Sequence, residues 1–148
     1  MSHEPSDSEP KIVMLPVRRA MRRPMPNQCK GYTTRMCFDG TEIVLRTAEY
    51  DDGMLAEILL DAPKLSLAQR TMLQSFAKAI SVGLQHGIPL ATFVETYLHI
   101  RSGTLTAVIE GNPRIQRATS IEDMILRELA IAYLDRQDLI QDDNSDDS

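Results

Sequence analysis

The stretch SLAQRTMLQSFAKAISVGLQHGIPLATFVETYL, residues 66–98, predicts a long amphipathic helix, a glycine stop and a second, shorter helix. Apolar residues recur at helical spacing along the first helix and form one stripe, made of Leu73, Phe76, Ala77, Ile80 and Leu84. Ser66 and Gln69 have the spacing of a capping box, which favours a helix start at this point. Gly87 followed by Pro89 favours a helix end.

Three segments before this helix, residues 33–38, 41–47 and 54–60, read as short β-strands. Asp39-Gly40 is a tight-turn dipeptide, and residues 50–53 form a second turn signal, so the strands are expected to pair as two hairpins. The third strand is expected to bury one face, made of Met54, Ala56, Ile58 and Leu60. So small a sheet needs a hydrophobic partner, which is the long helix.

A last helix is predicted to begin near Thr119-Ser120, with Glu122 or Asp123 placed to complete a second capping box. Its apolar stripe is expected to be Ile121, Met124, Ile125, Leu129, Ala132 and Tyr133. Residues 105–109 between the helices suggest one further short strand. The predicted fold class is therefore α+β: a three-stranded antiparallel β-meander packed against a long helix, with a short second helix and a C-terminal helix.

Composition excludes several classes of protein. No run of roughly 18 apolar residues is present, so we expect no membrane span. The acidic, polar beginning of the chain does not resemble a secretory signal, which favours a cytoplasmic location. Aromatic residues are only 5% of the chain and tryptophan is absent, so the core must be mainly aliphatic. Cys29 and Cys37 are expected to be free thiols, with a disulfide or a redox role left as alternatives.

Charge is distributed unevenly along the chain, whose net charge is −5. We expect a disordered acidic head (residues 1–10), an extended basic arm (11–32), an α+β domain (33–137) and a disordered acidic tail (138–148). The arm is expected to dock apolar residues on the core, among them Met14, Leu15 and Met25. The basic side chains that could bind phosphate groups or an acidic partner are Arg18, Arg19, Arg22, Arg23, Lys30 and Arg35. Because the chain is acidic overall and has no aromatic residue among these arginines, an acidic protein partner or the chain's own tail is favoured over nucleic acid.

The residues indicate no catalytic centre. His3, His86 and His99 lack the spacing of a metal site, and no phosphate-binding glycine loop is present. We expect neither a metal nor a cofactor.

Four segments resemble the region that follows the catalytic barrel in cobalamin-dependent (class II) ribonucleotide reductases, a region called the TSCPD domain. They are KGYTTR (30–35), LRTAEYDDGMLAEILLD (45–61), ISVGLQHGIPLATFV (80–94) and ATSIEDMILRELAIAYLDRQDL (118–139). The resemblance covers about residues 22–139. It implies that the radical cysteine, the cobalamin contacts and the substrate loops belong to a barrel that this chain does not contain.

The resemblance therefore predicts a stand-alone, non-catalytic relative of the reductase's accessory domain, which acts through protein–protein contact. Its expected partner is a ribonucleotide reductase or a second copy of the chain, in the context of deoxyribonucleotide synthesis. The ribonucleoside-diphosphate reductase activity of the family is not expected of this chain alone. Two alternatives stay open, a small nucleic-acid-binding regulator that uses the basic arm and a nucleotide-binding sensor.

Overall fold

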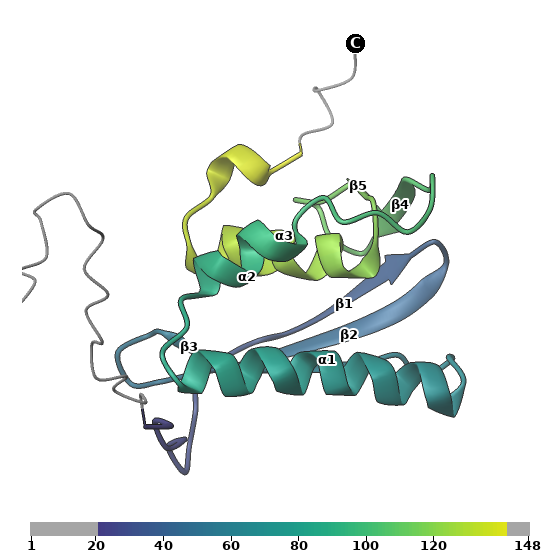
Figure 1. Ribbon diagram of the computed structural model, residues 1–148. Coiled ribbons are helices and arrows are strands. Elements are labelled where there is room, and N and C mark those ends of the chain that lie inside the picture. The colour runs from purple at the N-terminus through teal and green to yellow at the C-terminus, as the bar shows by residue number, and fades with distance from the viewer. Residues whose placement is uncertain (1–20, 142–148) are drawn as a thin grey trace, which may run out of the picture.

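The computed structural model describes residues 21–141. Within these residues one antiparallel sheet has the strand order β3-β2-β1-β4-β5. The strands are β1 (Thr33–Phe38), β2 (Thr41–Glu49), β3 (Leu55–Asp61), β4 (Ala107–Glu110) and β5 (Arg117–Ala118). The helices are α1 (Leu67–Gln85), α2 (Leu90–Tyr97) and α3 (Ile121–Tyr133), followed by the short 3-10 helix η1 (Gln137–Leu139). In Figure 1 β1 and β2 are seen between α1, which runs along β3, and the pair α2 and α3.

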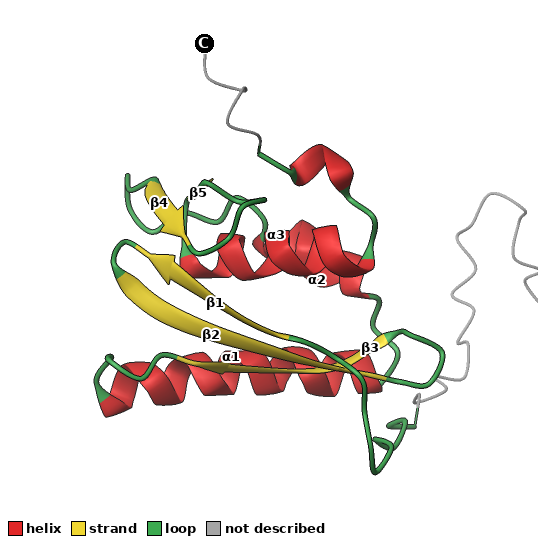
Figure 2. Ribbon diagram, turned by 180° about the vertical axis from the view of Figure 1, so that it is seen from behind, coloured by secondary structure: helices red, strands yellow, loops and turns green. Residues whose placement is uncertain are grey.

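The two predicted hairpins are present. Asp39 and Gly40 both have positive φ, 49° and 78°, and connect β1 to β2 in the two-residue turn that this dipeptide favours. The sheet is larger than the predicted three strands, because β4 pairs with β1 through Cys37–Glu110 and Phe38–Ile109, and β5 pairs with β4. Figure 2 shows β4 and β5 at the end of the sheet away from α1, next to α3.

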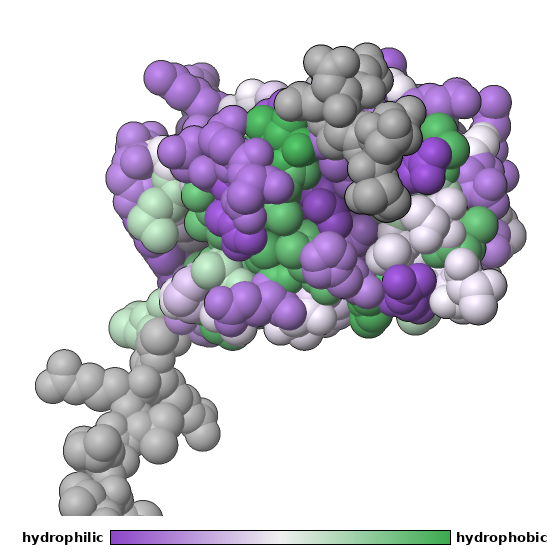
Figure 3. Space-filling view, turned by 90° about the horizontal axis from the view of Figure 1, so that it is seen from above, coloured by the Kyte–Doolittle hydropathy of each residue, from purple (hydrophilic) through white to green (hydrophobic). Residues whose placement is uncertain are grey.

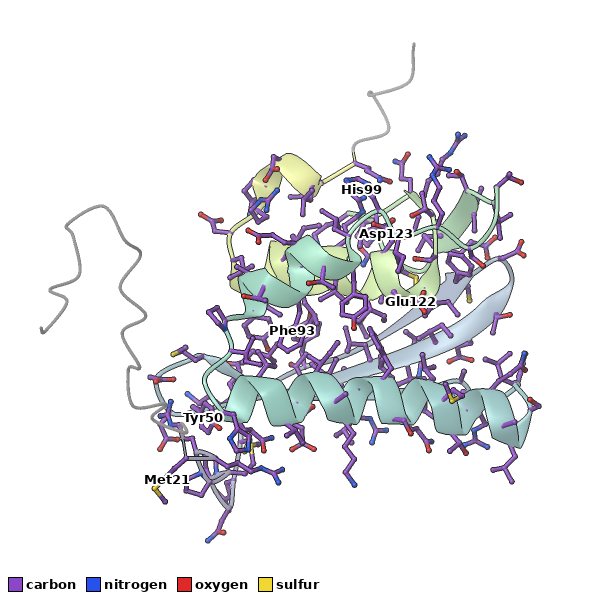
Figure 4. The ribbon with its side chains drawn as sticks, viewed as in Figure 1. Met21, Tyr50, Phe93, His99, Glu122 and Asp123 are labelled. Atoms are coloured by element: carbon purple, nitrogen blue, oxygen red, sulfur yellow. The ribbon has the colours of Figure 1, made fainter. Side chains whose placement is uncertain are left out.

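Helix α1 begins as predicted, with both hydrogen bonds of the Ser66–Gln69 capping box in place. It ends at the expected glycine, since Gly87 has φ of 91°. Gly83 allows α2 to approach closely, because a Cβ atom there would lie 2.6 Å from the ring of Phe93. Figure 4 shows Phe93 between α2 and α1. The stripe of α1 faces the core, with Ile80 and Leu84 buried; Leu73 and Phe76 are partly buried against it.

Alternate residues of β1–β3 face a single core, and these include Met36, Ile43, Leu45, Ile58 and Leu60. One predicted inward residue is wrong: Met54 is 63% exposed. Its carbonyl accepts a hydrogen bond from the backbone N–H of Tyr50, so Met54 belongs to the turn before β3.

Helix α3 is buried far beyond the predicted apolar stripe. Every residue from Asp123 to Ile131 is buried, whereas Ala132, predicted to lie in the stripe, is exposed. Charged residues can lie inside because they are paired: Arg127 bonds to Asp123, and Arg114 bonds to Glu128.

Seen from the side of α2 and α3, the surface is largely hydrophilic around a narrow apolar strip (Figure 3). The helices therefore direct most of their apolar side chains toward the sheet.

Candidate functional site

The basic arm is clamped onto the domain at Arg23. Its guanidinium lies 3.8 Å from the centre of the Tyr50 ring and 3.1 Å from Asp52 Oδ2. The backbone N–H of Arg23 donates to the carbonyl of Gln85 at 2.7 Å, and the Tyr50 hydroxyl donates to the carbonyl of Arg23 at 3.1 Å. Met21 and Tyr50 lie at the same end of α1 (Figure 4). These contacts fix the point at which the arm meets the fold.

The arm also crosses β2 closely at Gly31. A Cβ atom there would lie 1.9 Å from the carbonyl oxygen of Thr47, so only glycine fits. On either side of Gly31, main-chain bonds join Tyr32 to Thr47 and Lys30 to Glu49. The Lys-Gly-Tyr segment, residues 30–32, is therefore the place where the arm crosses β2.

Side chains of α1 form hydrogen bonds with main-chain groups at the outer edge of β3. Ser81 Oγ accepts from the N–H of Ile58 at 2.9 Å and lies 3.0 Å from the carbonyl oxygen of the same residue. Gln85 Nε2 donates to the carbonyl of Ala56 at 3.1 Å, while its Oε1 accepts from Arg22 Nε at 2.6 Å. Hydrogen-bonding groups that an edge strand would offer to another chain are thus already used.

The opposite edge, at β5, is covered by Gln141. The Oε1 atom of this side chain accepts from the N–H groups of Gln116 and Arg117, both at 2.8 Å, and its Nε2 donates to the carbonyl of Arg117 at 3.1 Å. The backbone N–H of Gln141 also donates to the carbonyl of Arg114. Part of each outer edge of the sheet is therefore already hydrogen-bonded within the chain.

That outer face forms one wall of the open-face groove, a hollow of about 680 Å3 between β1–β3, α1 and the arm. Register places its strand residues side by side: Arg35 lies opposite Val44, and Arg46 lies opposite Leu59. Lys78 projects from α1 into the same groove. The lining thus combines cations from four segments (Arg22, Arg35, Arg46 and Lys78) with two acids, Glu57 and Asp61.

The predicted basic residues are divided by the structure. Arg18 and Arg19 lie outside the described residues, as do Met14, Leu15 and the head and last seven residues of the chain. Arg22 and Arg35 line the groove, whereas Arg23 is held in the clamp and Lys30 is exposed beside it. Within residues 21–141 these basic residues have ion pairs with the hairpins, Arg23 to Asp52 and Arg35 to Glu42.

Sequence reasoning missed Arg46 and Lys78. The alternation of β2 placed Arg46 on the outward face, and a helical projection places Lys78 away from the apolar stripe. Both signals are present in the sequence, but only the strand register and the position of α1 bring the two side chains together.

A buried polar network lies on the inner side of the sheet. Glu128, nearly fully buried, accepts hydrogen bonds from Tyr32, Asn112 and Arg114. Burial, with the neighbouring Glu128 charge, raises the pKa of Tyr32 above its ordinary value. Burial likewise raises the pKa of Tyr133 to about 12, and its hydrogen bond to Glu49 acts in the same direction. These groups have partners within the fold, so the network holds the arm to α3.

A second hollow, the end pocket, lies where the arm, the β2–β3 turn and the α1–α2 turn meet. Its volume is about 560 Å3, and exposed apolar side chains from the three segments line it: Met21, Met54 and Ile88.

Residues 21–141 contain no cluster of three or more His, Cys, Asp or Glu side chains that could hold a metal ion. Cys29 and Cys37 are both free thiols, the first exposed and the second half-buried. None of the helices in this part of the chain is long and apolar enough to cross a membrane.

The resemblance noted in the sequence is confirmed by comparison with known proteins. The chain belongs to the TSCPD domain family, whose family model matches residues 13–133. It is similar to the vitamin B12-dependent ribonucleotide reductase of Agrobacterium fabrum, with 42% identity over 125 residues, which is 84% of this chain and 10% of that enzyme. The enzyme of the same name from Bradyrhizobium diazoefficiens is 42% identical over 133 residues, 87% of this chain and 10% of the relative.

A third relative, the vitamin B12-dependent ribonucleotide reductase of Streptantibioticus cattleyicolor, is 32% identical over 130 residues, 88% of this chain and 21% of the relative. The chain therefore spans about a tenth of the length of the first two relatives and about a fifth of the third. No solved structure matches the chain.

Proposed function

We propose that this chain is a non-catalytic TSCPD module that acts by binding a protein, in the context of ribonucleotide reduction. The partner we propose is a vitamin B12-dependent ribonucleotide reductase. Family membership and the similarity to a short part of such enzymes support this proposal. We expect no ribonucleotide reduction by the chain alone.

One observation carries the proposal: the open-face groove combines an exposed apolar side chain with cations that have no acidic partner among residues 21–141. Leu59 is 53% exposed there, and Arg46 and Lys78 have no ion-pair partner among the described residues. An antiparallel sheet normally turns a polar face to water, so an exposed leucine flanked by unneutralised cations suits a contact surface.

The contacts that the basic arm makes within the fold favour a protein partner over nucleic acid. A phosphate-binding arm needs cationic side chains that can reach a phosphate backbone. Here Arg23 is already bonded to Asp52 and stacked on Tyr50.

Binding to the reductase can be measured by isothermal titration calorimetry, with light scattering to follow self-association. The test variant is Arg46→Glu with Lys78→Glu, which reverses the spare charge of the groove. The matched control is Arg101→Glu with Arg136→Glu, which changes net charge equally at two positions that do not line the groove. We expect the test variant to lose at least tenfold in affinity and the control to stay within twofold.

Recovery of the chain from native extract with no partner and no self-association would contradict the proposal. An equal loss of affinity in both variants would show that the groove is not the binding surface, because both variants change the net charge of the chain by the same amount.

A further inference from the structure

The open-face groove carries more positive than negative charge that is free to bind. Asp61 is held by Arg70 through two hydrogen bonds of 3.0 Å, which keep the pKa of this carboxyl below its usual range. Arg35 lies 3.5 Å from Glu42. Among residues 21–141, Arg22 donates to the amide oxygen of Gln85 and has no carboxylate partner.

The remaining charged residues of the groove add to this excess of positive charge. Within residues 21–141, neither Arg46 nor Lys78 has an acidic partner, and Glu57 is the one lining carboxylate that no arginine or lysine holds. Three cations therefore face a single acid, in a chain whose net charge is −5. Such a local excess attracts an anionic ligand.

Apolar side chains form the floor between these cations. Leu59 lies directly opposite Arg46 on the neighbouring strand, and Val44 lies opposite Arg35. Met25 from the arm and Val82 from α1 line the same hollow. The ligand must therefore bring apolar surface as well as negative charge.

The lining argues for a polypeptide over a nucleotide or nucleic acid. None of the described residues that line the groove is aromatic, so no ring is available to stack on a base. The main-chain N–H groups of β2 are committed to the ladders with β1 and β3, so the sheet offers no loop of free N–H groups of the kind that cradles phosphate.

We propose that the groove binds an extended protein segment in which acidic and apolar side chains occupy every second position and so share one face. The acids meet Arg22, Arg46 and Lys78, and the apolar side chains lie on Leu59, which is 53% exposed. The inference rests on the proposed function, and it adds the chemistry of the segment that the partner must present.

The test uses the full chain and fluorescein-labelled peptides in a fluorescence polarisation assay. The first probe is Asp-Gly-Leu-Gly-Glu-Gly-Leu-Gly-Asp, whose acidic and leucine side chains share one face when the peptide is extended. A second probe replaces its acids with lysine, a third replaces its leucines with alanine, and unlabelled ATP and a single-stranded oligonucleotide serve as competitors.

We expect the first peptide to bind in the micromolar range, as small interfaces do, and the lysine peptide not to bind. Arg46→Glu with Lys78→Glu should weaken the first peptide at least tenfold, and Arg101→Glu with Arg136→Glu by less than twofold. Leu59→Ser should weaken it severalfold without affecting the alanine peptide, because that peptide places no leucine on the floor.

The inference is overturned if the first peptide fails to bind, if the lysine peptide binds as tightly, or if ATP or the oligonucleotide displaces the peptide at lower concentration than unlabelled peptide does. If the reductase binds and the groove variants abolish that binding while every peptide fails, the inference is wrong and the proposed function stands. If the reductase also fails to bind, both are wrong.

Discussion

The two faces of the sheet differ in how completely their polar groups are satisfied. On the inner face, which packs on α3, Glu128 has three hydrogen-bond partners and Asp123 accepts from the N–H groups of His99 and Thr119. Figure 4 shows Asp123 beside His99. On the outer face Arg46 and Lys78 have no acidic partner in the described part of the chain. The same strands thus supply a closed face that determines stability and an open face available for binding.

The largest expected difference concerns two adjacent leucines of β3. Leu60 is 3% exposed on the inner face, and Leu59 is 53% exposed on the outer face. Leu60→Ala should lower the free energy of unfolding by about 2–5 kcal/mol, because it leaves a cavity in the core. Leu59→Ala should cost less than about 1 kcal/mol, because its side chain already contacts water.

Urea unfolding followed by circular dichroism measures both changes in the free energy of unfolding. Similar costs for the two leucines would show that the outer face is covered, and would remove the distinction between the faces.

A smaller difference is expected for two glutamates. Glu128→Ala removes the acceptor of Tyr32 and Asn112, so it should cost about 2–3 kcal/mol of unfolding free energy. Glu57→Ala, on the outer face, should change stability by no more than about 0.5 kcal/mol. Thermal unfolding of both variants at one pH gives the comparison. A harmless Glu128→Ala would mean that water satisfies the network and that the inner face is not closed.

The smallest expected difference separates two serines of α1. Ser81→Ala leaves the N–H of Ile58 without its partner at the edge of β3 and should cost about 1–2 kcal/mol of unfolding free energy. Ser75→Ala, at an exposed position of the same helix, should cost nothing or slightly stabilise, because alanine has the higher helix propensity. Amide exchange at Ile58 should quicken only in the Ser81 variant. Unchanged exchange there would show that the helix does not protect this edge.

The sequence predicts local structure well because its signals are local. Asp39-Gly40, the Ser66–Gln69 box and Gly87 each specify a turn or a helix end through a few neighbouring residues. The pairing of β4 with β1 joins Phe38 to Ile109, and no residue pattern near either position indicates the other. The two-residue strand β5 is too short to give any periodic signal.

Burial of α3 was underestimated for a related reason. The residues Asp123, Arg127 and Glu128 read as a polar side in the helical pattern, but each has a charged or polar partner inside the fold. Arg127 pairs with Asp123 on the same helix, whereas the partners of Glu128, such as Arg114, come from other segments and appear only in three dimensions.

The candidate site could be predicted in part. The basic character of the arm and the outward position of Arg46 follow from charge and strand alternation. Two things could not be foreseen: Arg23 is used in a clamp on Tyr50, and Lys78 of α1 reaches the same groove as Arg46. Both depend on where α1 lies relative to β3, which its amphipathic pattern alone does not determine.

The central claim is that the outer face of β1–β3 is the surface that meets the partner. Cross-saturation NMR tests it most directly: the reductase is irradiated, and transfer to amides of the deuterated chain reports which residues lie at the contact. The account predicts strong transfer at Arg46, Leu59 and Lys78, and little at Arg101, Glu122 and Arg136. Transfer concentrated at Arg101, Glu122 and Arg136 would contradict it.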